Sequence, residues 1–156
     1  MRRPPLVIAW GNPLRGDDGA GAAVARTLGA RRGATVRVCH QLTPELAADV
    51  AAASRVVFVD AEAGSTGRRT AAPTRRVRVR RLRVRHARPA GFTHALTPEH
   101  LLALAKALYG TAPPAFLVTV MGERFALRPE LSPSVRRLIP AAARAVARLL
   151  APRPQP

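Results

Sequence analysis

The sequence has little of several residue types, and each shortage excludes a class of protein. Its single cysteine, Cys39, excludes an internal disulfide and suits a reducing compartment. No apolar run reaches the roughly 18–20 residues of a membrane helix. The apolar stretch after Arg2 and Arg3 is shorter than the ~7–15 residues of a signal-peptide core. We therefore expect a cytoplasmic protein with no membrane association, in which Cys39 is a packed structural thiol.

Negative charge, lysine and aromatic residues are also scarce. There are 9 acidic residues against 26 basic ones, which gives a net charge of +17, and Lys106 is the only lysine. Arginine dominates from Arg68 to Arg88. This excess has three explanations: compositional drift, a dock for an acidic protein, or a nucleic-acid surface. Aromatic residues that would stack on bases make up only 4% of the chain, so we expect no nucleic-acid partner.

The 156 residues fit one domain, which we expect over residues 1–151, with a disordered tail at 152–156. Strand-like and helix-like segments alternate along the chain. This order predicts an α/β fold: a three-layer αβα sandwich around a twisted, mostly parallel five-stranded sheet. The expected strands are Leu6–Trp10, Thr35–Leu42, Arg55–Asp60, Arg76–His86 and Ala115–Met121. The expected helices are Gly19–Ala30, Pro44–Ala53, Pro98–Tyr109 and Pro133–Ala151.

Local signals refine these boundaries. Thr43, Thr97 and Ser132 each precede a proline, the pattern of an N-cap followed by proline at the first helical position. Pro140 predicts a kink or a break in the last helix. The strand at residues 76–86 alternates and is basic, which favours an edge strand, and the phase slip at Arg80–Arg81 suggests a bulge.

The segment "GNPLRGDDGAG", residues 11–21, joins the first strand to the first helix. Strand, glycine-rich turn and helix usually form a phosphate site, but Asp17 and Asp18 would repel an anion. Asp60 is expected at the end of the third strand, and His94 lies before the Thr97 cap. Carboxylates gathered with an imidazole suit a divalent cation such as zinc or nickel. The alternatives are that Asp17 caps a helix, Asp60 serves a turn and His94 is a surface histidine.

The same segment resembles the signature G-N-x-L-x-x-D-[DE]-x-x-G of the hydrogenase maturation protease family. The likeness continues through "VVFVDA", "THALTPEHLLALAKALYG" and "LSPSVRRLIPAAARAVARLL". It implies an endopeptidase that removes the C-terminal extension of a nickel–iron hydrogenase large subunit after nickel insertion. It implies a twisted sheet between helices, nickel supplied by the substrate, and the metal ligands Asp18, Asp60 and His94. The large-subunit precursor would be the partner of a monomeric protease.

The chemistry that follows from this resemblance is hydrolysis without an acyl-enzyme, because no Ser–His–Asp or Cys–His arrangement is evident. In the simplest hypothesis for hydrolysis, a metal polarises the scissile carbonyl or binds the attacking water, and a free carboxylate such as Asp17 assists. The expected catalytic residues are Asp17, Asp18 and Asp60. Glu62 is a further carboxylate, which we expect to be exposed. The sequence departs from the family at Ala9 and Trp10, where a glycine is usual, and between Ser65 and Pro89.

Two other functions remain open at this stage. A non-catalytic nickel-sensing assembly factor would need the same ligands. A peptidyl-tRNA hydrolase-like enzyme would share "GNP" and the positive charge, but that family continues with a threonine–arginine–histidine–asparagine run that is absent here.

Overall fold

The computed structural model describes residues 3–29, 33–64, 76–84 and 96–151. The described strands form one five-stranded sheet in the order β2-β1-β3-β5-β4. Strands β1 (Leu6–Trp10), β2 (Thr35–Cys39), β3 (Val56–Ala63) and β5 (Ala115–Gly122) are parallel, and β4 (Val77–Leu82) runs antiparallel to β5. The expected mostly parallel sheet is confirmed. The tail expected at 152–156 lies outside the described residues.

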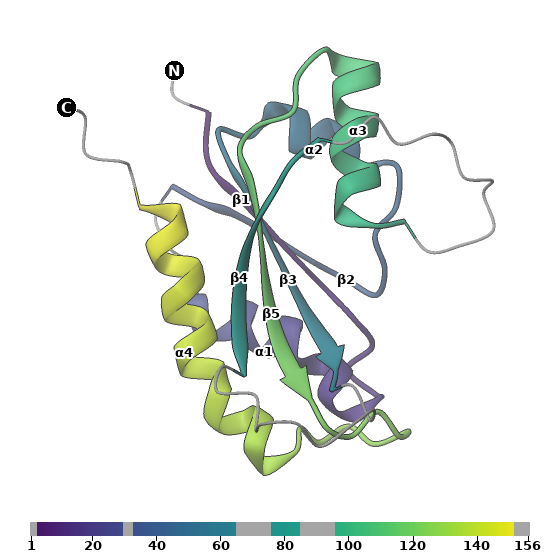
Figure 1. Cartoon of the computed structure of the whole chain (residues 1–156), viewed down its shortest axis with the longest axis vertical. Coiled ribbons are helices and arrows are strands. Elements are labelled where there is room, and N and C mark those ends of the chain that lie inside the picture. The colour runs from purple at the N-terminus through teal and green to yellow at the C-terminus, as the bar shows by residue number, and fades with distance from the viewer. Residues whose placement is uncertain (1–2, 30–32, 65–75, 85–95, 152–156) are drawn as a thin grey trace.

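Helices cover both faces of this sheet (Figure 1). Helices α1 (Ala20–Leu28) and α4 (Pro133–Leu150) pack on one face, where the core includes Val7, Val59 and Val118. Helices α2 (Leu46–Ala52) and α3 (Pro98–Tyr109) pack on the other, over Ile8 and Phe58. Because β1 and β3 are apolar on both faces, they occupy the interior of the sandwich. The expected three-layer αβα architecture is confirmed.

Two of the three predicted helix caps are present. The side chains of Thr97 and Ser132 accept hydrogen bonds from the backbone N–H groups of His100 and Val135, each with proline at the start of the helix. The cap predicted at Thr43 is wrong. Tight turns form there first, with the N–H of Leu46 donating to the carbonyl of Thr43, so α2 begins later, at Leu46. Pro140 lies within α4 on its exposed side, and the helix continues past it without a break.

Strand β4 is a basic edge strand, as predicted, but it has no bulge. Its register with β5 is unbroken through Arg80 and Arg81. The phase slip has another cause: Val79 is 50% exposed, so this strand does not need strict alternation of apolar and polar side chains. β4 is also shorter than the predicted 76–86, and β2 ends at Cys39 rather than Leu42.

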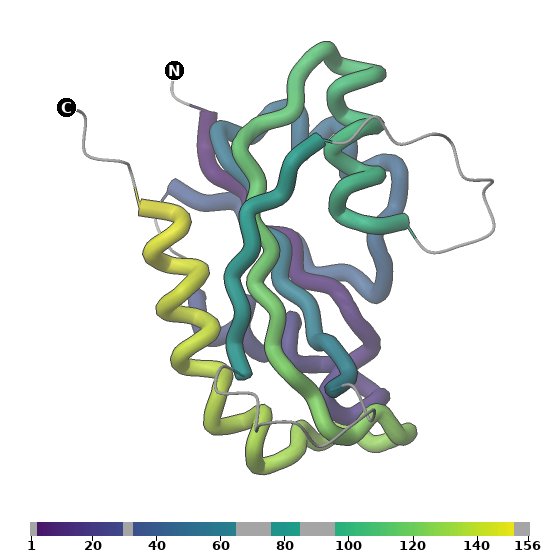
Figure 2. Tube along the Cα trace, in the orientation of Figure 1, coloured from purple at the N-terminus to yellow at the C-terminus, as the bar shows by residue number. Residues whose placement is uncertain are grey.

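The tube in Figure 2 runs from β1 through a tight turn into α1 at the same end of the sheet where β3 and β5 finish. This end carries the carboxyl termini of the three central parallel strands, the usual place for a ligand in an open α/β sheet. Within the described residues, no helix is both long enough and apolar enough to cross a bilayer.

Candidate functional site: two carboxylates at the carboxyl end of the sheet

The turn after β1 is shaped by Gly11. Its φ of +134° is one that residues with side chains rarely adopt, and an added Cβ would lie 2.1 Å from the carbonyl oxygen of Asp18. The backbone can therefore fold tightly back on residue 18. The ring of Trp10, at the end of β1, lies edge-on to the ring of Phe58, with 6.1 Å between the two centroids.

Asp18 is held by this turn with its carboxylate partly exposed. The backbone N–H of Asn12 donates to Oδ2 of Asp18 over 2.7 Å, and the N–H of Leu14 donates to Oδ1 of Asn12 over 2.9 Å. Residues Gly16–Gly19 form a short 3₁₀ helix, η1, that leads into α1. The loop thus presents one oxygen to its own backbone, and Oδ1 of Asp18 keeps its acceptor capacity for a ligand.

Asp60 lies within β3, next to Thr119 of β5 in the parallel register. The expectation that it ends the strand is wrong, because β3 continues to Ala63. Burial, with smaller contributions from the charges of Asp18 and Glu62, raises the pKa of Asp60 to about 7, although the hydrogen bond from the N–H of Ala61 lowers it. Strand β3 pairs in parallel with β1, so Asp60 and the loop that carries Asp18 belong to the same end of the sheet, and the charge of Asp18 raises the pKa of Asp60.

This pair has the chemistry of a cation site. A carboxyl whose pKa lies near 7 is half-protonated at neutral pH, and a divalent cation beside it favours the charged form. Carboxylate oxygens suit such an ion, and an imidazole would widen the choice to nickel or zinc. Among the described residues, no three His, Cys, Asp or Glu side chains come together as a ligand set. His94 lies outside those residues, so the full set of Asp18, Asp60 and His94 stays a prediction.

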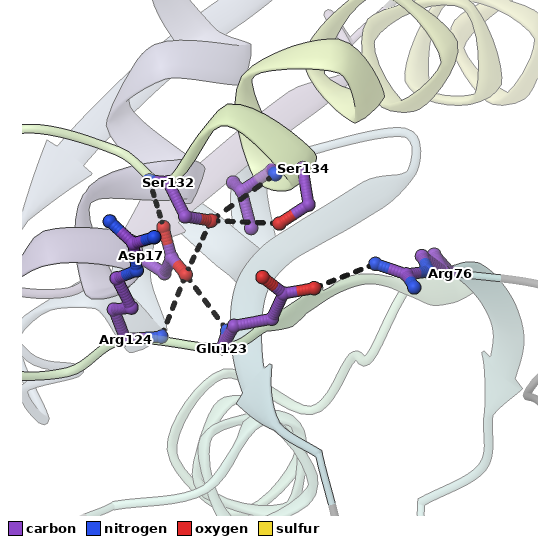
Figure 3. Close-up of polar contacts among 7 residues, drawn as sticks. Asp17, Arg76, Glu123, Arg124, Ser132 and Ser134 are labelled. Atoms are coloured by element: carbon purple, nitrogen blue, oxygen red, sulfur yellow. Dashed lines mark hydrogen bonds and ion pairs between the residues drawn. The ribbon is translucent and has the colours of Figure 1, made fainter.

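Asp17 is fully buried, and its carboxylate meets Glu123, Arg124 and Ser132 (Figure 3). Its carboxylate accepts hydrogen bonds from the backbone N–H groups of Glu123 (2.8 Å), Arg124 (2.9 Å) and Ser132 (2.7 Å), and from the hydroxyl of Ser132 (2.9 Å). Burial alone would raise the pKa of Asp17, but these four bonds together lower it below its usual value. Asp17 joins the loop after β1 to the loop between β5 and α4. It has no free carboxylate oxygen of the kind expected of a catalytic base.

The partners of Asp17 belong to a polar network that the sequence alone does not reveal. The hydroxyl groups of Ser132 and Ser134 lie 3.0 Å apart, and Glu123 pairs with Arg76 at 2.8 Å (Figure 3). A hydrogen bond from Ser134 and the pairing with Arg76 lower the pKa of Glu123. The sequence predicted Ser132 only as a helix cap. It did not predict the hydrogen bond from Ser132 to Asp17, which lies 115 positions away.

Glu62 and Cys39 behave as expected. Glu62 is exposed and lies 3.9 Å from a guanidinium nitrogen of Arg78 on β4. The thiol of Cys39 donates to the carbonyl of Ala9, and burial raises its pKa, so it is a poor nucleophile at neutral pH.

A cavity of about 490 Å³ opens beside the network, between the loop after β1 and the loop between β5 and α4. Its lining includes Gly16, Phe125 and Leu131, with Arg124, Arg128, Glu123 and Glu130 among its charged residues. The cavity lies next to the loop that carries both aspartates.

Solved structures that resemble this chain over most of its length include hydrogenase maturation enzymes. The hydrogenase maturating endopeptidase HybD from E. coli shares 27% identity and a TM-score of 0.68, over 96% of this chain and 92% of that one. The [NiFe] hydrogenase maturation protease HybD from Thermococcus kodakarensis shares 22% identity and a TM-score of 0.69, over 97% and 100%. An Escherichia coli endopeptidase shares 26% identity and a TM-score of 0.62, over 96% and 92%. No protein-family model matches the chain, and no curated protein does.

Proposed function

We propose that this chain is a member of the hydrogenase maturation protease family, an endopeptidase that acts on a nickel–iron hydrogenase large subunit. It removes the C-terminal extension of that subunit after nickel has been inserted. Two of the similar solved structures, at 26–27% identity, are endopeptidases by their descriptions, which supports a peptidase. In this proposal the chain works in the cytoplasm as a monomer, docks one precursor and binds no nucleic acid.

The single observation that carries the proposal is the meeting of Asp18 and Asp60 at the carboxyl end of the sheet. Asp18 comes from the signature loop and Asp60 from β3, and the charge of Asp18 raises the pKa of Asp60. Two carboxylates placed together without a cation weaken the folded state, so their placement is better explained by a ligand that carries positive charge.

Nickel is part of the substrate in this proposal. The inserted nickel would be bound by Asp18, Asp60 and His94, so that only a nickel-loaded precursor is recognised. A bound cation would polarise the scissile carbonyl or a water molecule. Because Asp60 has a pKa of about 7, it can accept or release a proton at neutral pH. Asp17 has a different role: its four hydrogen bonds hold the loop that presents Asp18.

The test is cleavage of a nickel-loaded large-subunit precursor, followed by mass measurement of its C-terminus, with nickel-free precursor as the control. We expect a discrete C-terminal peptide to be lost only from the nickel-loaded form. Asp18→Asn and Asp60→Asn should each lower the cleavage rate at least about 100-fold, the scale of losing a charged group from a catalytic site. Asparagine keeps an oxygen that can accept the N–H of Asn12 or Ala61, so these variants remove charge and preserve the turn.

Asp49→Asn is a matched control, because Asp49 is partly exposed on α2 and forms an ion pair with the exposed Arg37. It should cleave at the wild-type rate. Full activity in both site variants would contradict the proposal. If wild-type protein binds the nickel-loaded precursor tightly but never cuts it, the non-catalytic assembly factor is the correct function.

A further inference from the structure

The loop after β1 and the loop between β5 and α4 together form an exposed surface next to the candidate site. We define it as the two-loop surface, made of Leu14, Arg15, Arg124, Leu127 and Arg128. Leu14 is 56% exposed and Leu127 is 81% exposed. Two leucines this exposed, on neighbouring loops, are a pattern of binding surfaces rather than of a solvated loop.

The backbone brings these residues together. Arg15 and Arg128 form a parallel β-bridge, and Leu14 and Leu127 are the residues that precede them. The N–H of Gly16 also donates to the carbonyl of Arg128, over 2.5 Å. The leucines therefore stand at equivalent positions on two strands of chain that lie side by side.

Hydrogen bonds of Asp17 also join the two loops of this surface. The N–H of Asp17 donates to the carbonyl of Arg124, and its carboxylate accepts from the N–H groups of Glu123, Arg124 and Ser132. A surface ordered before binding loses less conformational entropy when a partner docks. These bonds stabilise the two loops in one arrangement and leave their outer side chains free.

The charge of the surface selects the partner. The three arginines are exposed, and no ion pair involves any of them among the described residues. Of the two acids that line the cavity, Glu123 is paired with Arg76 and Glu130 is exposed. Between the loops, the cavity of about 490 Å³ has Phe125 and Leu131 in its lining, so it can receive an apolar side chain.

We infer that the two-loop surface docks an acidic segment of the large-subunit precursor, one that carries a large apolar side chain flanked by aspartates or glutamates. The apolar side chain enters the cavity beside Phe125, and the acids meet Arg15, Arg124 and Arg128. Since the loop also carries Asp18, docking here brings the precursor to the two carboxylates. This inference rests on the proposed function for the identity of the partner.

The test measures binding separately from cleavage. Affinity for nickel-loaded precursor is measured by calorimetry with Leu14→Ser/Leu127→Ser and with Arg15→Glu/Arg124→Glu/Arg128→Glu. We expect each variant to bind at least about tenfold more weakly, and the affinity of the arginine variant no longer to fall as salt is added. Unchanged thermal unfolding midpoints exclude misfolding, as expected for such exposed side chains.

Two matched controls lie away from the surface. Leu108→Ser removes a leucine that is 63% exposed at the end of α3, and Arg144→Glu reverses an exposed charge on α4. Both should bind the precursor like wild type. If the control variants lose as much affinity for the precursor as the surface variants, binding depends on net charge or overall apolarity and not on this surface. That result would overturn the inference.

The outcomes separate this inference from the proposed function. A precursor that binds wild type, binds the surface variants weakly and is never cut supports the surface and contradicts the endopeptidase. A precursor that is cut normally, with unchanged affinity in the surface variants, contradicts the surface alone. Failure of wild type to bind the precursor overturns both. If the arginine variant instead loses affinity for RNA while its precursor affinity is unchanged, the surface is for nucleic acid and the inference is wrong.

Discussion

Asp17 and Ser132 are 115 positions apart in the chain, and both the backbone N–H and the hydroxyl of Ser132 donate to the Asp17 carboxylate, at 2.7 and 2.9 Å. One aspartate of the signature loop therefore holds the start of α4, and the other, Asp18, is left to face a ligand. The two aspartates therefore have different roles. The carboxylate of Asp17 accepts four hydrogen bonds and stabilises the fold, whereas the carboxylate of Asp18 accepts one and is available to a ligand.

Replacing Asp17 should weaken the fold strongly. In Asp17→Asn, at least one of the three backbone N–H donors would face the amide NH2 group, which cannot accept a hydrogen bond. The substitution also removes a buried negative charge whose hydrogen bonds are all made. We expect the free energy of unfolding to fall by about 3–5 kcal/mol, measured by urea denaturation at pH 7. Asp49→Asn, which removes only an exposed pair, should change it by less than about 1 kcal/mol.

The same variant has a pH signature. Because the pKa of Asp17 is lower in the folded than in the unfolded protein, its contribution is present above its ordinary value of 3.8 and is lost as pH falls through the folded value. The stability difference between wild type and Asp17→Asn should therefore shrink below pH 3.8. A difference that is constant from pH 7 to pH 3 would contradict the hydrogen-bonded carboxylate.

Asp60 should give the opposite pH dependence. Its folded pKa of about 7 lies above its ordinary 3.8, so between these values the folded protein holds a proton that the unfolded chain has released. Stability then falls as pH rises from about 4 to 7, by up to roughly 4 kcal/mol at 1.36 kcal/mol for each pKa unit. In Asp60→Asn this loss should disappear, so that the variant is more stable than wild type at pH 8.

Urea denaturation of both proteins at pH 5 and pH 8 measures this effect, with Asp49→Asn as the control for general charge removal. Parallel stability curves for wild type and Asp60→Asn would contradict a raised pKa at Asp60. A carboxyl resonance of Asp60 that titrates with a midpoint near 4 would do so directly.

Gly16 should tolerate no side chain, and Gly29 provides a matched comparison. Both have φ of +58°, but an added Cβ at Gly16 would lie 2.5 Å from the carbonyl oxygen of Arg124, whereas nothing lies within 4 Å at Gly29. Gly29→Ala should cost roughly 1–3 kcal/mol for the backbone conformation alone, because Gly29 has ψ of −165°. Gly16→Ala should cost roughly 1–3 kcal/mol more, because the loops must separate. Equal unfolding free energies for the two variants would contradict the tight contact.

The sequence alone was enough to find the family resemblance and to predict the parts of the fold that have strong local patterns. β1 and β5 are apolar runs, and the Thr97 and Ser132 caps each precede a proline, so these elements needed only short-range information. The predictions failed where local preference was weak: the Thr43 cap was replaced by tight turns, and β4 has no bulge, because an edge strand with two exposed faces tolerates an irregular pattern.

The sequence by itself determined that β and α segments alternate around a mostly parallel sheet, that Asp17 and Asp18 lie on the loop after β1, and that the chain is strongly basic. These follow from periodicity, composition and motif spacing, which are local properties of the chain. Only the tertiary structure decided that Asp18 lies close to Asp60, that Asp17 is buried against Ser132, and that Leu14 and Leu127 stand on adjacent loops. Those relationships join residues far apart in sequence. They depend on the order of strands in the sheet and on how two loops pack, which no local pattern encodes.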